Sequence, residues 1–351
     1  MAEKSTILDV ARVSGVGLGT VSRVINHPQT VKADTVALVQ STMEQLGYVP
    51  PPPEKRRGRR VGQSYPRRPL SQILLIIVGD KGLKWTLNMA PVFASVLDGI
   101  EKACVANNTN LIIKQATNWD ALSHSLDNNK GYGVILFGSD EPTGAPPEVL
   151  RKAPAVWVMG SPEKFRGDHV QPDHSRIGLI AADYLLAAGH RHIAYLGSGE
   201  GSPRFHVGFR ASAFKWAVLH AGGQVEMLTS SNLIIADSEH NSPNETVAAG
   251  LIARLAAQKP RPTALMIEAD MLAPITYRLL QTHAIAPQKD IAVITCNNEQ
   301  PYLLSLNPKP LVIDLQAMSI GQRAVDQLLW RRNHMQEPAM RIMIEPSLLL
   351  P

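Results

Sequence analysis

Residues 15–26, GVGLGTVSRVIN, decide the fold of the amino-terminal part of the chain. Three glycines at alternate positions raise the question of a phosphate-binding loop. The dinucleotide motif G-x-G-x-x-G, however, needs a glycine where the chain has Thr20, and it needs a hydrophobic strand before it. The preceding residues, from Ile7 to Ser14, instead carry apolar side chains at helical spacing, and Thr6 can cap that helix. We therefore predict that the glycines lie between two helices.

Working outward, residues 1–48 are predicted to form three short helices, near 6–14, 18–26 and 33–46. Each helix has one apolar face, and in the second helix that face includes Val21 and Val24. Three amphipathic helices in so short a segment indicate a small bundle with one shared core.

A linker is predicted at residues 49–70, VPPPPEKRRGRRVGQSYPRRPL. Its four consecutive prolines favour extended polyproline geometry and exclude helix there. Residues 1–68 contain eleven Lys and Arg against five Asp and Glu, whereas the rest of the chain has 24 basic and 25 acidic residues. The whole positive excess therefore lies at the amino-terminal end, which indicates a polyanionic partner for that end.

Residues 71–351 alternate between apolar strands and helices, which predicts an α/β fold with two parallel-sheet lobes. We expect one lobe to contain roughly 71–168 plus 301–332, and the other 169–300 plus 333–351. Ligands of such folds bind beyond the carboxyl ends of the strands, here in the cleft between the lobes. The expected strands are 73–78, 111–113, 133–138, 155–160, 193–197, 265–267 and 291–295.

The chain resembles the LacI/GalR transcriptional regulators over almost its full length. The headpiece motifs are ILDVARVSGVGLGTVSRVIN (7–26) and LGYVP (46–50). The core motifs are AAGHRHIAYLG (187–197), KPLVIDLQAMSIGQRAVDQLL (309–329) and IMIEPSLLLP (342–351). The headpiece motif is highly specific, and the core motifs are less so because periplasmic sugar-binding proteins share that fold.

This resemblance implies a helix-turn-helix headpiece, a two-lobed effector-binding core, and no enzymatic activity. It implies a repressor that binds a palindromic double-stranded DNA operator as a homodimer, or as a tetramer, in the cytoplasm with the nucleoid. Base edges are expected to be read by Leu18, Gly19 and Arg23, and phosphates to be contacted near Thr6, Thr20, Ser22 and Asn26.

The headpiece departs from the family at two positions. Gly17 replaces the usual Ser or Thr at the helix N-cap, and Gly19 has no side chain to read a base. Direct recognition of bases then rests mainly on Arg23, which either pairs with a guanine or clamps a phosphate.

The linker also departs from the family, whose short hinge helix inserts a leucine into the minor groove. Here Glu54 stands at the alanine position of that helix and Arg57 at the leucine position. Two interpretations remain open: Lys55, Arg56 and Arg57 enter a narrow A/T-rich minor groove, or they form a basic tether that follows phosphates.

The effector-binding residues of the family are changed in this chain. Phe205 stands at the arginine position, with Arg204 one residue early, and the aspartate position holds Asn297. Either the effector is less polyhydroxylated than a hexose, which we favour, or the cleft binds nothing. Asp270 is a candidate ligand contact or a helix N-cap, and Trp85 a stacking face or a surface residue. The candidate effector contacts are Asp80, Trp85, Arg204, Phe205, Asp270 and Asn297.

Other chemistry is not indicated by the sequence. There is no G-x-S-x-G motif, His190 and His192 have no partner at metal-ligand spacing, and no cofactor motif occurs. No run of eighteen apolar residues predicts a membrane span, and no signal peptide is expected. A solute receptor and an α/β enzyme with a helical accessory domain remain the alternatives to a DNA-binding regulator, which we favour.

Overall fold

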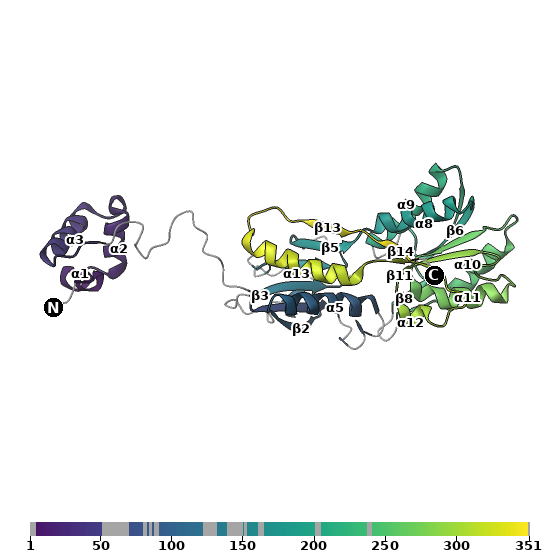
Figure 1. Ribbon diagram of the computed structural model, residues 1–351, viewed down its shortest axis with the longest axis horizontal. Helices are drawn as coiled ribbons and strands as arrows, with labels where there is room; N and C mark the ends of the chain where they lie inside the picture. The colour runs from purple at the N-terminus through teal and green to yellow at the C-terminus, as the bar shows by residue number, and fades with distance from the viewer. Residues whose placement is uncertain are drawn as a thin grey trace. The chain divides into compact units, whose positions relative to one another are not determined.

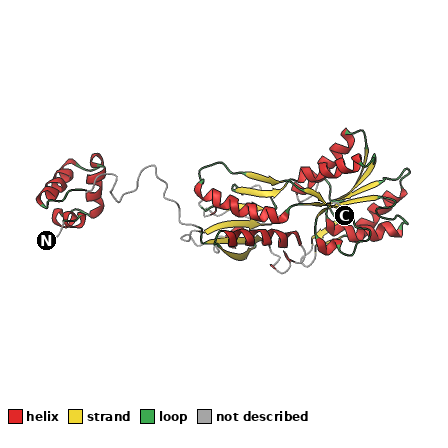
Figure 2. Cartoon of the chain, in the orientation of Figure 1, coloured by secondary structure: helices red, strands yellow, loops and turns green. Residues whose placement is uncertain are grey.

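The chain divides into two compact units, residues 1–65 and 66–351. The computed structural model describes residues 5–50, 70–79, 83, 86–87, 91–121, 132–138, 150, 153–160, 165–200, 205–236 and 241–349. Of the side chains in these ranges, those of 205–207, 235–236 and 241–242 lie outside the description. Figures 1 and 2 show a helical first unit and a second unit of strands and helices.

The first unit is the predicted three-helix bundle (Figure 1). Its helices are α1 (Ile7–Ser14), α2 (Leu18–Asn26) and α3 (Ala33–Gln45), with a 3-10 turn η1 (Pro28–Thr30) after α2. Its centre is a cluster of four buried valines, Val10, Val21, Val24 and Val39. Both the helix positions and the shared core were predicted correctly.

The first lobe of the second unit is a six-stranded sheet in the order β13-β5-β4-β3-β1-β2, with every pairing parallel. Helices α5 (Pro91–Ala106) and α13 (Ala317–Asn333) cover one face of it. These two helices approach closely at a glycine, because a Cβ atom on Gly99 would lie 2.1 Å from the Met318 carbonyl oxygen. The strands are β1 (Gln72–Val78), β2 (Asn110–Ala116), β3 (Tyr132–Phe137), β4 (Ala155–Val158), β5 (Asp168–Pro172) and β13 (Arg341–Ile344).

The second lobe is a six-stranded sheet in the order β14-β12-β11-β10-β6-β7, parallel except for β14. Helices α8 (His174–Ala187) and α9 (Phe205–His220) pack on one face, and α10 (Glu245–Ala257) and α11 (Ala273–Thr282) on the other (Figure 1). The strands are β6 (His192–Gly197), β7 (Gln224–Thr229), β10 (Ala264–Ile267), β11 (Ala292–Asn297), β12 (Leu311–Asp314) and β14 (Ser347–Leu349). Short elements complete the lobe: the β8 (Ile234–Ala236) and β9 (Asn241–Pro243) hairpin, η3 (Asp270–Leu272) and α12 (Gln300–Leu303).

The chain crosses between the lobes after β5, after β12 and after β13, so the expected lobe boundaries were wrong. Residues 311–314, expected in the first lobe, form β12 of the second sheet. Residues 169–172 and 341–344, expected in the second lobe, belong to β5 and β13 of the first sheet. A strand's apolar pattern shows that it is buried, but it does not show which of two similar sheets it joins.

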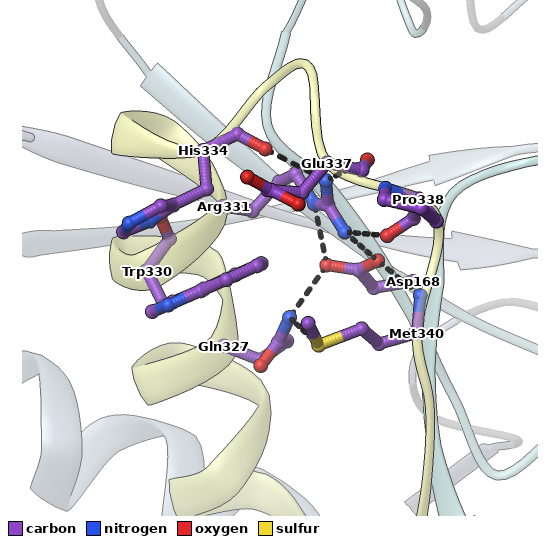
Figure 3. A network of polar contacts seen from close by, with 8 residues as sticks. All are labelled: Asp168, Gln327, Trp330, Arg331, His334, Glu337, Pro338 and Met340. Carbon is purple, nitrogen blue, oxygen red and sulfur yellow. Dashed lines mark hydrogen bonds and ion pairs between the residues drawn. The ribbon is translucent and has the colours of Figure 1, made fainter.

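A buried ion pair fastens the last helix to the first lobe (Figure 3). The Arg331 guanidinium, on α13, donates to both carboxylate oxygens of Asp168 on β5, with Nε–Oδ2 at 2.8 Å and Nη2–Oδ1 at 2.6 Å. Gln327 Nε2 and the Met340 backbone N–H also donate to this carboxylate. Arg331 donates in turn to the carbonyls of His334, Glu337 and Pro338, so the network joins β5, α13 and the loop that precedes β13.

Among the described residues, no helix is long and apolar enough to cross a membrane.

Candidate DNA-binding interface and effector cleft

Helix α2 begins after the second glycine of the opening motif. Gly17 is the N-cap residue, with φ −58° and ψ 140°, and its carbonyl oxygen accepts from the Thr20 and Val21 backbone N–H groups at 2.8 and 3.1 Å. No side chain caps this end, as the glycine predicted. A Cβ atom at Gly17 or at Gly19 would meet nothing within 4 Å. The start of α2 is therefore open backbone with room for side chains.

The exposed face of α2 carries the residues expected to read bases. Val21 and Val24 are buried in the shared core, whereas Gly19 and Arg23 are exposed on the opposite side of the helix and Leu18 is exposed at its first residue. The bundle therefore presents this face to solvent rather than using it for packing.

Arg23 is held only loosely by the protein. Its Nε lies 3.4 Å from the Gly19 carbonyl oxygen and its Nη2 lies 3.5 Å from Thr20 Oγ1, which are long hydrogen bonds. Because these contacts are weak, the guanidinium is available for a stronger acceptor such as a base edge or a phosphate.

The expected phosphate contacts lie in two environments. Thr6 closes a capping box on α1, in which its Oγ1 donates to Asp9 Oδ2 at 2.7 Å and accepts from the Asp9 backbone N–H. Hydrogen bonds from the Thr6 side chain and backbone, together with the nearby Arg12 charge, lower the pKa of Asp9. Thr20 and Ser22 are half-buried on α2, and Asn26 Nδ2 donates to the Ser22 carbonyl at 2.8 Å.

Several sequence candidates fall outside the described residues: Lys55, Arg56, Arg57, Asp80, Trp85 and Arg204. Phe205 begins α9, but its side chain lies outside the description as well. Two effector candidates remain, Asp270 and Asn297, and the fold brings them to the same end of the second sheet, where β10 and β11 finish.

Asp270 is a buried member of a polar network and not a helix cap. It lies inside η3, whose N-cap is Ala269, so the expected capping role was wrong. Its side chain is fully buried, with Oδ1 receiving the Thr295 hydroxyl at 2.8 Å and Oδ2 the Glu299 backbone N–H at 2.6 Å. Burial raises the pKa of this carboxyl to about 8. Because both of its oxygens already accept hydrogen bonds inside the protein, this residue acts as internal framework.

Asn297 is engaged on both of its amide atoms. Its Nδ2 donates to Glu299 Oε2 at 2.9 Å, and its Oδ1 accepts from Arg210 Nη1 at 3.2 Å. The Arg210 guanidinium, which is 4% exposed, also donates to the Glu268 carbonyl oxygen and to His174 Nδ1. Helix α9 therefore places a buried guanidinium, that of Arg210, at this end of the sheet.

A second carboxylate network lies beside the first. Glu268, 2% exposed after β10, accepts from the Tyr195 hydroxyl at 3.0 Å, the Ser198 hydroxyl at 2.5 Å and the Ser198 backbone N–H at 2.9 Å. Burial of the ring and, to a smaller extent, the neighbouring Glu268 carboxylate raise the pKa of Tyr195 well above its ordinary value.

Four residues of these networks were not among the predicted site residues: His174, Arg210, Glu268 and Glu299. For Glu268 and Glu299 a signal exists: each is a charged residue that follows a parallel strand, one position after the predicted strand 265–267 and four positions after the predicted strand 291–295. Arg210 gives no such signal, since it lies in the middle of a helix. Within the described residues, no group of three or more His, Cys, Asp or Glu side chains is arranged to hold a metal ion.

Comparisons with known proteins agree with this geometry. The family model of the bacterial regulatory proteins of the lacI family matches residues 6–51, and that of the periplasmic binding protein-like domain matches residues 182–350. The HTH-type transcriptional repressor PurR of Edwardsiella ictaluri is 27% identical over 98% of this chain and 95% of its own length.

Solved structures show the same fold over nearly the whole chain. The transcriptional regulator CelR in complex with cellobiose has a TM-score of 0.61 at 21% identity, covering 99% of this chain and 98% of its own. The lac repressor dimer bound to operator and the anti-inducer ONPF has a TM-score of 0.58 at 18% identity, covering 99% and 98%. The capped helical bundle, the two-lobed parallel core and both family matches place the chain in one group of transcriptional regulators. Its residues 6–51 belong to the lacI family of bacterial regulatory proteins, and its residues 182–350 to the periplasmic binding protein-like domains.

Proposed function

We propose that the protein is a ligand-responsive repressor that binds a palindromic DNA operator as a homodimer, with a small-molecule effector between its two lobes. The observation that carries the proposal is the exposed surface of α2, where Gly19 and Arg23 lie opposite the buried valines and Leu18 is exposed at the helix start. A dimer presents two such helices related by a twofold axis, so its operator has two symmetric half-sites. The lac repressor, whose fold this chain shares, is a dimer on its operator.

In this proposal Arg23 reads a guanine and supplies most of the base discrimination. A guanidinium pairs with guanine O6 and N7, which discriminates by about 1–3 kcal/mol against other bases. Leu18 contacts a thymine methyl group, whereas Gly19 reads nothing. Thr6, Thr20, Ser22 and Asn26 fix the register on phosphates, and Lys55, Arg56 and Arg57 add salt-dependent affinity.

The test compares two arginine variants of the full chain on the duplex that it prefers and on a scrambled duplex. Arg23→Ala is expected to lose about ten- to a hundredfold of the preference for the first duplex. Arg12→Ala removes the same charge from α1, where Arg12 pairs with Asp9 at 2.9 Å, and should change both affinities equally. If Arg23→Ala also weakens both affinities equally, Arg23 is a phosphate clamp and the proposed base contact is wrong.

For the effector, we propose a ligand with fewer hydroxyl groups than a hexose. Sugar hydroxyls are usually held by carboxylate and amide groups that have hydrogen-bonding capacity to spare. Asp270 is buried with both oxygens engaged, and Asn297 uses both amide atoms within the protein. Because their polar atoms are already engaged, these residues favour a ligand that needs few hydrogen-bonding partners.

A further inference from the structure

Glu299 lies where the two lobes of the core meet. It follows β11 after two residues with positive φ, Asn297 at 118° and Asn298 at 64°, and it immediately precedes α12. Left-handed backbone at two successive non-glycine positions is uncommon and needs support from the surroundings. The buried Asp270 carboxyl provides such support, since it accepts the Glu299 backbone N–H at 2.6 Å. The position of this residue is therefore built into the fold.

The Glu299 carboxylate has partners on both lobes. Oε2 accepts from Asn297 Nδ2 at 2.9 Å in the second lobe, and Oε1 accepts a long hydrogen bond from the Val92 backbone N–H at 3.4 Å in the first. Val92 is the second residue of α5, so its N–H has no partner within the helix and lies at the positive end of a 16-residue helix dipole. Glu299 itself is 6% exposed, which weakens competition from water for these contacts.

The polar contacts continue from Glu299 to α9, α8 and the end of β10 in the second lobe. Asn297 Oδ1 accepts from Arg210, and Arg210 donates to His174 Nδ1 and to the Glu268 carbonyl oxygen. Apolar contacts accompany them, because Val92 and Met159 of the first lobe pack against the core between the second sheet and α8 and α9. The described part of the cleft thus holds a connection from α5 to α9 made only of the protein's own groups.

We propose that Glu299 is an internal ligand that latches the two lobes together by binding the amino-terminal end of α5. Two-lobed proteins of this architecture commonly close around a bound ligand that touches both lobes. Here a buried carboxylate makes that connection, so the lobes stay closed before any effector binds. This inference rests on the proposed function in one respect: the cleft is taken as the place where an effector regulates the protein. The contact between Glu299 and α5 itself needs neither DNA nor effector.

The test is hydrogen exchange of the full chain, followed in peptides that cover the first turn of α5. Glu299→Ala is expected to speed exchange of these amides by about two- to tenfold, the change that follows the loss of one ordinary hydrogen bond, because the 3.4 Å contact is long. Glu299→Gln keeps the shape and loses the charge, and should give a smaller increase. Glu101→Ala removes an exposed carboxylate from the same helix and should leave the first turn unchanged.

Sodium acetate serves as the probe for the vacated carboxylate position in Glu299→Ala. Acetate is expected to slow exchange at the first turn of α5 again, whereas sodium chloride at the same ionic strength is not. First-turn exchange at the wild-type rate in both Glu299 variants would overturn the proposal, and so would equal protection by chloride. Because neither measurement contains DNA, failure of the latch is distinguishable from failure of operator recognition.

Discussion

Replacing Arg331 with methionine is expected to destabilise the core unit by about 3–5 kcal/mol, the range found when one partner of a buried ion pair is removed. Asp168 is fully buried and receives two hydrogen bonds from Arg331, at 2.6 and 2.8 Å. In the variant its charge keeps only neutral donors, the Gln327 amide and the Met340 N–H.

Two effects contribute to this loss, and the buried charge should dominate. Arg331 also serves the carbonyls of His334, Glu337 and Pro338, but these residues are exposed, so water can replace the guanidinium there. Water cannot reach Asp168 in the same way. Adding Asp168→Asn removes the charge, so the double variant should be more stable than Arg331→Met alone, by about 1–3 kcal/mol.

The assay is urea unfolding at one fixed protein concentration, followed by tryptophan fluorescence, to which the buried Trp157 of the first lobe contributes. Arg176→Ala is the matched control, because Arg176 pairs with Glu345 at an exposed site and its loss should amount to less than about 1 kcal/mol. A loss below about 1 kcal/mol for Arg331→Met, or a double variant no more stable than this single one, would refute the reasoning.

Three further predictions concern pH, the headpiece and the cleft. Burial holds the pKa of Asp270 at about 8, above its ordinary value, so the stability tied to its proton is complete at low pH and is lost as pH rises to about 8. Burial and the nearby Arg341 charge lower the pKa of His169 to about 4, which opposes this trend below pH 6.5. The free energy of unfolding of the wild-type protein should therefore fall between pH 6.5 and 8, by up to about 1.4 kcal/mol per pH unit. Asp270→Asn should make it nearly independent of pH in this range, and an unchanged pH dependence would contradict the raised pKa of Asp270. Gly19→Ala should raise the stability of the headpiece by about 0.5–1 kcal/mol in thermal melts, because the added methyl group meets no atom within 4 Å; a lower melting point would contradict the open geometry at this helix start. Glucose at millimolar concentration should leave the melting temperature of the full chain unchanged, and a saturable rise would show that the cleft takes a polyhydroxylated ligand.

The headpiece could be predicted from sequence because local signals determine it. Thr6 and Asp9 form a capping box, and the spacing of Val21 and Val24 fixes which side of α2 is buried. Once that side is known, the exposed positions of Gly19 and Arg23 follow.

The arrangement of the core could not be predicted to the same degree. Strand β5 has the sequence DHVQP, whose polar side chains gave no strand signal, although every residue in it is buried. Its Asp168 is stabilised by Arg331, 163 positions later in the sequence, and such a pairing leaves no local trace. The same holds for the cleft, where Arg210 reaches Asn297 across 87 positions.

Sequence recognition by the full chain is measured by selecting bound duplexes from a random pool at about physiological salt, where unspecific binding is weakened. We expect enrichment of one palindrome of roughly 14–20 base pairs, with two half-sites related by the dimer axis, and loss of that enrichment with Arg23→Ala. Recovery of unrelated or merely A/T-rich sequences would contradict this expectation, because the exposed face of α2 would then read no sequence.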